Sequence, residues 1–99
     1  MSDKPTWTFL TNHAHVLLCL ARDPEVRIRD VALQVGITER AAQRIVADLV
    51  EAGYLQRTKD GRRNHYVLDT DRPLRHPLES EHAIGEILGL LSAPLAAGE

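Results

Sequence analysis

The chain of 99 residues lacks the features that mark secreted, disulfide-stabilised and membrane-spanning proteins. Its single cysteine, Cys19, excludes an internal disulfide and fits a reducing compartment. No apolar run approaches the roughly 20 residues that a helix needs to cross a bilayer, and the first residues do not resemble a signal peptide. We therefore expect a cytoplasmic protein without membrane contact, folded as a single domain over residues 1–99 around one small core.

The chain also lacks an overall positive charge, since its net charge is −2. This charge is unevenly distributed along the chain. Residues 27–65 hold eight Lys/Arg against five Asp/Glu, a net +3, whereas residues 66–99 hold two Arg against six acids, a net −4. A basic middle region beside an acidic tail is the asymmetry expected of a protein that binds a polyanion.

The middle of the chain has the signals of two short helices joined by a tight turn. Gly36 can adopt the left-handed backbone geometry that ends a helix over about residues 29–35. Thr38 is a favourable N-cap for a further helix over about residues 39–52, and Gly53 is suited to end it. This succession predicts a helix–turn–helix.

The other elements are predicted from β-propensity, turn residues and caps. Two β-prone runs, 55–59 and 64–68, are joined by Asp60-Gly61, a dipeptide typical of tight hairpin turns. The fold class that we predict is mainly α with a small β-hairpin (α+β). In order, the expected elements are a helix over about 12–22, an extended segment or very short strand at 26–28, a helix–turn–helix within about 28–52, a hairpin within about 54–68 and a last helix over about 77–91.

The helix that follows Thr38 has two chemically different faces at 100° per residue. Its apolar stripe consists of Ala42, Ile45, Val46 and Leu49, and its opposite face centres on Arg40, Gln43, Arg44 and Ala47. Arg can pair with guanine and Gln with adenine through two hydrogen bonds each. An ordinary solvated helix face is the alternative. The candidate DNA-recognition residues are Thr38, Glu39, Arg40, Gln43 and Arg44.

The hairpin is strongly cationic, which suits contact with a phosphate backbone or a narrow minor groove. The alternative is that its charges only protect an exposed strand edge from aggregation, a purpose that one or two charges would serve. The candidate DNA-binding residues of this wing are Arg57, Lys59, Arg62, Arg63, Asn64 and His65.

Several stretches of the chain also resemble a known family. They are Trp7–His13, Ile37–Arg44, Asp48–Tyr54, Gly61–Tyr66 and Pro73–Pro77, and the resemblance extends over about residues 7–91. The family is that of winged helix–turn–helix transcriptional regulators of the MarR/ArsR-like kind, in particular short bacterial single-domain members. The resemblance implies a homodimer that binds double-stranded operator DNA, with Thr38, Arg40, Gln43 and Arg44 at the major groove and Arg62 and Arg63 in the wing.

The last expected helix has a broad apolar side, more than one copy of so small a protein can cover. We therefore expect a dimer interface in which this helix meets the first helix and the N-terminal aromatic residues. The residues expected there are Trp7, Phe9, Ile84, Ile87, Leu88 and Leu91. The alternative is a helix that folds back on the core of its own chain.

The remaining polar residues indicate neither catalysis nor a cofactor. No nucleophile–base pair, phosphate-binding glycine loop or dense metal set is apparent, so no enzyme is expected. A metal at Glu79, His82 and Glu86 with His76 nearby, and a redox role for Cys19, are both disfavoured. The sequence does not identify a small-molecule effector. The competing hypothesis to a DNA-binding regulator is a winged-helix module that binds another protein.

Overall fold

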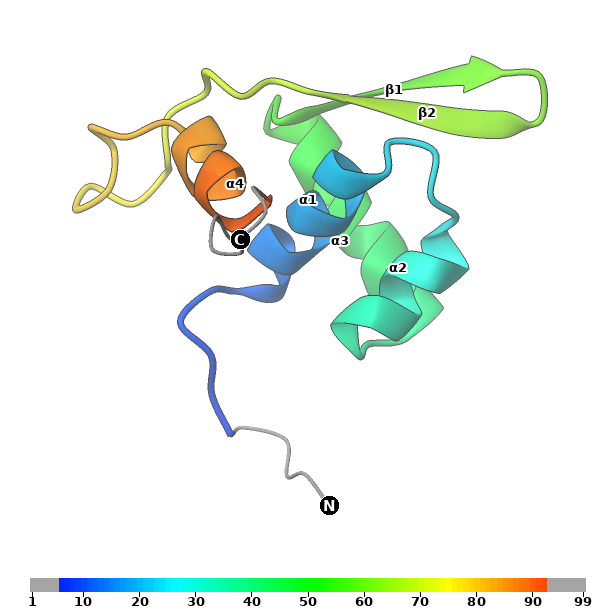
Figure 1. The fold of residues 1–99 in the computed structure, drawn as a ribbon, viewed down its shortest axis with the longest axis horizontal. Coiled ribbons are helices and arrows are strands. Elements are labelled where there is room, and N and C mark those ends of the chain that lie inside the picture. The colour runs from blue at the N-terminus through cyan, green and yellow to red at the C-terminus, as the bar shows by residue number, and fades with distance from the viewer. Residues whose placement is uncertain (1–5, 93–99) are drawn as a thin grey trace, which may run out of the picture.

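A computed structural model describes residues 6–92 and contains four helices and one antiparallel hairpin within that range (Figure 1). In chain order these elements are α1 (Asn12–Arg22), α2 (Ile28–Val35), α3 (Glu39–Glu51), β1 (Leu55–Asp60), β2 (Arg63–Leu68) and α4 (Ile84–Ser92). Helix α1 packs against α2, α3 and α4, and the hairpin extends from the end of α3 along one side of the helices. The fold is that of a winged helix–turn–helix.

The helix boundaries follow local sequence signals. The Thr11 hydroxyl accepts a hydrogen bond from the Ala14 N–H at the start of α1, and the Thr38 hydroxyl accepts one from the Ala41 N–H (3.0 Å) at the start of α3. Each threonine satisfies a backbone donor that the first helical turn leaves unpaired. Gly36 ends α2 with a φ of 88°, a left-handed conformation that favours glycine. The predictions for Thr38 and Gly36 are confirmed.

The hairpin follows from equally local signals. Its register pairs Leu55 with Leu68 and Asp60 with Arg63, so Gly61 and Arg62 form a two-residue turn. Gly61 has a φ of 68°, as tight turns of this kind require. The predicted hairpin is confirmed, with strands one residue longer at the turn end than expected.

The core lies where α1, α3, the base of the hairpin and α4 meet. The predicted apolar stripe of α3 is buried and packs against Val16, Leu17 and Leu20 of α1 and Val31 of α2. The hairpin is anchored by the buried Tyr66. Because α3 is held by this face alone, its opposite face is left towards solvent.

Of the two predictions for residues 26–28, the very short strand is wrong, and extended backbone is found at Arg27, with φ −77° and ψ 147°. Helix α2 already begins at Ile28, and the residues before it form a turn around Asp23, whose carboxylate accepts the Glu25 N–H (3.1 Å) and whose carbonyl accepts the Val26 N–H (3.1 Å). One backbone bond, from the Tyr66 N–H to the Pro24 carbonyl (3.0 Å), joins this turn to the outer edge of the hairpin. A single bond does not make a strand.

The last helix begins at Ile84, so the predicted start near Pro77 is wrong. Pro73 and Ala83 form an isolated antiparallel bridge, which requires the chain between them to reverse direction. That reversal occupies the residues that were expected to be helical. The helix start is instead specified by Glu86, whose carboxylate accepts the Ala83 N–H (2.9 Å) as the third residue of a capping box does.

Candidate nucleic-acid interface

The outward face of α3 carries the side chains expected to contact DNA. Arg40, Gln43 and Arg44 are all exposed, and none of them forms a hydrogen bond or ion pair with any residue in the described range 6–92. Ala47, one turn further along, is also exposed and is small enough for a close approach. The structure therefore brings together three long polar side chains whose donors and acceptors are available to a partner.

The N-terminus of α3 lies beside these side chains. Thr38 and Glu39 are exposed, and the Thr38 hydroxyl accepts the Ala41 N–H as described above. Thr38 was predicted as a cap and as a DNA-contacting residue. Its capping role leaves the hydroxyl hydrogen and the first backbone N–H groups available, at the positive end of the helix dipole. The Glu39 carboxylate adds a negative charge at this end.

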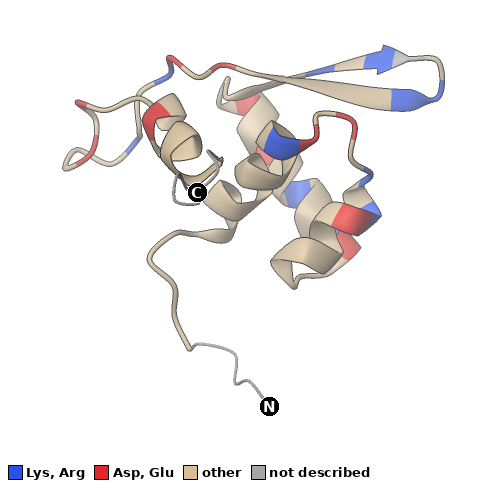
Figure 2. Cartoon of the chain, in the orientation of Figure 1, with Lys and Arg blue, Asp and Glu red and all other residues tan. Residues whose placement is uncertain are grey.

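The hairpin presents its cations to solvent. Figure 2 shows Lys and Arg towards the far end of the hairpin, whereas the linker to α4 carries acids. Arg57, Lys59, Arg62 and Arg63 are exposed and form no ion pair with a described side chain. The two other predicted wing residues are half-buried. His65 lies 3.4 Å from Glu25 in the α1–α2 turn, measured from Nδ1 to Oε2, and this contact ties β2 to the helical part of the protein.

The prediction of site residues missed a hollow between the hairpin and the start of α2. It has a volume of about 370 Å³, and Arg27, Arg62 and Arg63 line it together with the carboxylate-bearing Glu25. Arg27 is the N-cap of α2 and provides no side-chain cap, so the first N–H groups of this helix have no side-chain acceptor at the cap. The charge count of residues 27–65 includes Arg27, but only the fold places it beside the hairpin turn.

A second missed contact involves an acid of α3. His13 of α1 lies 3.0 Å from Asp48, from Nε2 to Oδ2, and both side chains are about half exposed. This contact draws the Asp48 carboxylate toward α1. The outward face of α3 presents two cations and an amide, with the exposed acids Glu39 in the first turn and Glu51 in the last.

The residues predicted for a dimer interface fall into two groups. Ile84 and Leu88 are 6% and 4% exposed and belong to the core of their own chain, as the alternative of a helix folded back had anticipated. The others remain accessible. Phe9 and Trp7 are 91% and 67% exposed, their rings meet edge to face at 4.9 Å, and Leu91 is 40% exposed. Phe9 and Ile87 line one hollow of about 340 Å³, so the N-terminal segment and α4 share an apolar surface.

The disfavoured metal and redox residues have structural contacts. His82 lies 2.7 Å from Glu86 (Nδ1 to Oε1), and the same carboxylate caps α4. The bond from the Ala83 N–H, and then the bond to His82, lower the pKa of Glu86 below its ordinary value. Among residues 6–92 no three metal-binding side chains come together. Cys19 is buried, which raises its thiol pKa, and its Sγ lies 3.5 Å from the Gln34 Oε1 atom.

Within the same range, none of the helices has the length and apolar character that a membrane span requires. Comparison with curated proteins gives no match. Among solved structures, the chain is similar to the PcaV transcriptional regulator from Streptomyces coelicolor, whose crystal structure was determined in complex with its natural ligand. The TM-score is 0.55 and the sequence identity is 29% over 90% of this chain. The chain corresponds to 64% of the length of that protein, less than two thirds.

A family model described as the MarR family matches residues 8–63, which comprise α1, the helix–turn–helix and the hairpin through its turn. The matched region contains every exposed cation of α3 and of the hairpin. The match confirms the resemblance noted from the sequence and the expectation that the protein is not an enzyme. The chain belongs to the MarR family of winged helix–turn–helix transcriptional regulators, whose members bind operator DNA.

Proposed function

We propose that the protein is a homodimeric, sequence-specific regulator that binds double-stranded DNA with α3 in the major groove. The observation that supports this most strongly is the availability of Arg40, Gln43 and Arg44, which are exposed and without partners among the described residues. Arg and Gln side chains at the N-terminal half of a recognition helix contact base edges through two hydrogen bonds. Arg44 and Gln43 would distinguish guanine and adenine in each half-site.

The hairpin would hold the flanking backbone or enter the adjacent minor groove. Arg57, Lys59, Arg62 and Arg63 are exposed, and cations at such positions bind phosphates largely without regard to sequence. The hollow beside Arg27 adds a further place for a phosphate, between the turn of the hairpin and the start of α2. Base contacts from α3 would provide specificity, and the hairpin would provide register and affinity.

The homodimer would form through the apolar surface shared by the N-terminal segment and α4. Trp7, Phe9 and Leu91 expose apolar area that the chain itself leaves uncovered, and Ile87 lines the hollow beside Phe9. Burial of this area in a two-fold dimer would be favourable at about 25 cal/mol per Å². A two-fold dimer implies two half-sites on one face of the DNA, about one helical turn or a multiple apart.

Selection of bound sequences from random duplexes, followed by gel shifts at several salt concentrations, tests the proposal. We expect a two-fold symmetric consensus and an affinity for it about 10³-fold or more above that for unrelated DNA. Binding without sequence preference, or no binding, would favour the alternative, a winged-helix module that docks on another protein. Glu81→Gln changes an exposed charged residue of the loop before α4, outside the hollow shared by Phe9 and Ile87, and serves as the control for substitutions in α3.

A further inference from the structure

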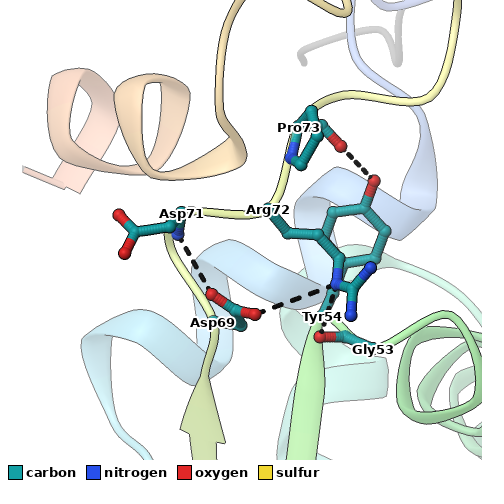
Figure 3. A network of polar contacts seen from close by, with 6 residues as sticks. All are labelled: Gly53, Tyr54, Asp69, Asp71, Arg72 and Pro73. Carbon is teal, nitrogen blue, oxygen red and sulfur yellow. Dashed lines mark hydrogen bonds and ion pairs between the residues drawn. The ribbon is translucent and has the colours of Figure 1, made fainter.

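The segment that follows the hairpin, residues 69–74, is bonded to the end of the recognition helix (Figure 3). We call it the strap. The Asp69 N–H donates to the Tyr54 carbonyl (3.0 Å), the Tyr54 hydroxyl donates to the Pro73 carbonyl (2.5 Å), and the Arg72 Nε–H donates to the Gly53 carbonyl (3.1 Å). Gly53 and Tyr54 are the residues with which the chain leaves α3. The strap therefore cannot move independently of that helix end.

The same strap is bonded on its other side to the start of α4. The Arg72 carbonyl accepts the Ile84 N–H (2.8 Å), the Thr70 carbonyl accepts the Gly85 N–H (2.9 Å), and the Leu74 N–H donates to the His82 carbonyl (2.9 Å). A Cβ added at Gly85 would lie 2.7 Å from the Thr70 carbonyl oxygen, so only glycine permits this approach. The strap is consequently a rigid connection between α3 and α4, which have no direct helix-to-helix packing of comparable extent.

Arg72 occupies the centre of this connection. Gly53 has a φ of +89°, and the guanidinium of Arg72 fills the space in which a Cβ at this position would lie. The Nε atom also lies 3.8 Å from the Asp69 Oδ2 atom, and the other oxygen of that carboxylate accepts the Asp71 N–H (3.2 Å). Both side chains are about half exposed, so the ion pair contributes little by charge alone. The planar guanidinium instead holds the strap in place by its shape, because it donates to the Gly53 carbonyl while it covers Gly53.

We propose that Arg72 is a positioning residue that determines which spacing of DNA half-sites the protein accepts. This inference rests on the homodimer and the DNA-binding mode proposed above. If α4 contributes to the dimer interface and α3 enters the groove, the angle between them sets the distance between the two recognition helices. Helix α1 packs against both α3 and α4, and the strap adds a direct connection that restrains the angle between them. Arg72 is the side chain of the strap that bonds to the exit of α3.

A small change of angle is enough to matter. Helix α3 has 13 residues and is therefore about 20 Å long. A tilt of about 10° at its C-terminal end, where the strap is bonded, would move its N-terminal end by about 3.5 Å, which is one base-pair step along the duplex. Removal of the Arg72 side chain would leave base contacts within a half-site intact, because Arg40, Gln43 and Arg44 lie at the other end of the helix.

The test measures binding to a series of duplexes, each with two copies of the selected half-site, in which the spacing increases by one base pair from one duplex to the next. A further duplex contains a single copy of the half-site. We expect the wild-type protein to prefer one spacing by about tenfold or more over its neighbours, a difference of about 1.4 kcal/mol. For Arg72→Ala we expect this preference to fall to about threefold or less, with unchanged affinity for the single half-site. Glu81→Gln, in the loop before α4 and outside the hollow shared by Phe9 and Ile87, should retain the wild-type profile.

Arg72→Lys separates geometry from charge. Lysine keeps the positive charge near Asp69 but cannot place a planar guanidinium over Gly53, so its spacing profile should resemble that of Arg72→Ala. A wild-type profile for Arg72→Ala would overturn the inference, and a wild-type profile for Arg72→Lys would overturn the geometric reason for it. If Arg72→Ala does not fold, Arg72→Lys carries the test alone, and a wild-type profile for that variant would overturn the inference. Failure of the wild-type protein to dimerise or to select a sequence would instead refute the proposed function.

Discussion

The side chains of Arg40, Gln43 and Arg44 have no partner among residues 6–92 and lie together on the outward face of α3. Their neighbours on the other face of α3 are buried. One face of α3 is buried in the core, and the polar side chains of the opposite face form no hydrogen bonds within the described residues. Their donors and acceptors are therefore available to a ligand. At the scale of single residues, this division supports base contact by α3.

Arg44→Ala should therefore lose specific binding. We expect a loss of about 1–3 kcal/mol for the selected site and a relaxed preference at the base pair that Arg44 contacts. Gel shifts with the consensus and with single-base variants measure both effects. Parallel losses on the consensus and on unrelated DNA would assign Arg44 to the backbone instead.

Arg62→Ala should act differently, because Arg62 lies in the turn of the hairpin. We expect weaker binding to all sequences alike and a decrease of about one in the slope of log affinity against log salt for each phosphate that the variant no longer neutralises. Titrations at four or five salt concentrations give the slope. The prediction fails if the slope stays at the wild-type value while the consensus alone is weakened.

Glu86 provides a prediction of pH dependence. The pKa of Glu86 in the folded protein is lowered, first by the bond from the Ala83 N–H and then by the bond to His82. The ionised carboxylate therefore stabilises the fold at pH values above the ordinary pKa of 4.5, and this stabilisation is lost as the pH falls through the lower pKa of the folded state. We expect Glu86→Gln to be less stable than wild type near neutral pH and the difference to shrink below about pH 4. Urea unfolding across this range tests the trend, and a constant difference would contradict it.

At the scale of elements, the sequence predicts those parts whose signals are local. Thr38 and Gly36 bound the turn of the helix–turn–helix through bonds to residues three or four positions away. The start of α4 was not predictable in this way, because it depends on the bridge between Pro73 and Ala83. Pro77 is favourable in a first helical turn, but the chain reversal that this bridge requires overrides that preference.

In the candidate site, too, the residues that depend on local sequence patterns were predicted and those that depend on tertiary packing were not. The outward face of α3 follows from helical periodicity, so Arg40 and Arg44 were predicted from the sequence alone. Arg27 was missed, because its place beside Arg62 depends on how the hairpin lies over the start of α2. The burial of Ile84 and Leu88 was not resolved either, since periodicity identifies an apolar side but not which molecule covers it.

Two glycines of α4 give a matched test of the packing of that helix. A Cβ at Gly89 would meet nothing within 4 Å, whereas one at Gly85 would lie 2.7 Å from the Thr70 Cβ and carbonyl oxygen. We expect Gly89→Ala to raise the free energy of unfolding by about 0.5–1 kcal/mol and Gly85→Ala to lower it by about 1–3 kcal/mol. Chemical denaturation measures both, and equal effects of the two substitutions would show that the strap does not approach α4 closely.

At the scale of the whole molecule, the net charge of −2 conceals a separation of charge. The region from Arg27 to His65 has a net charge of +3 and contains α2, α3 and most of the hairpin, whereas residues 66–99 have a net charge of −4. This separation orients the protein on a polyanion, because the acidic side is repelled while the basic side is attracted. None of the exposed cations of α3 and the hairpin lines the apolar hollow between Phe9 and α4, so a dimer formed there would leave these cations accessible to DNA.

The central claim is that the outward face of α3 and the cationic hairpin bind one duplex together. Hydroxyl-radical and base-methylation footprinting of the wild-type protein on its selected sequence tests it most directly. We predict protection of guanine N7 in two symmetric major-groove half-sites, flanked on each outer side by backbone protection that Arg62→Ala removes. Backbone protection without any protected guanine in the major groove, or no footprint at a concentration that saturates binding, would contradict the account.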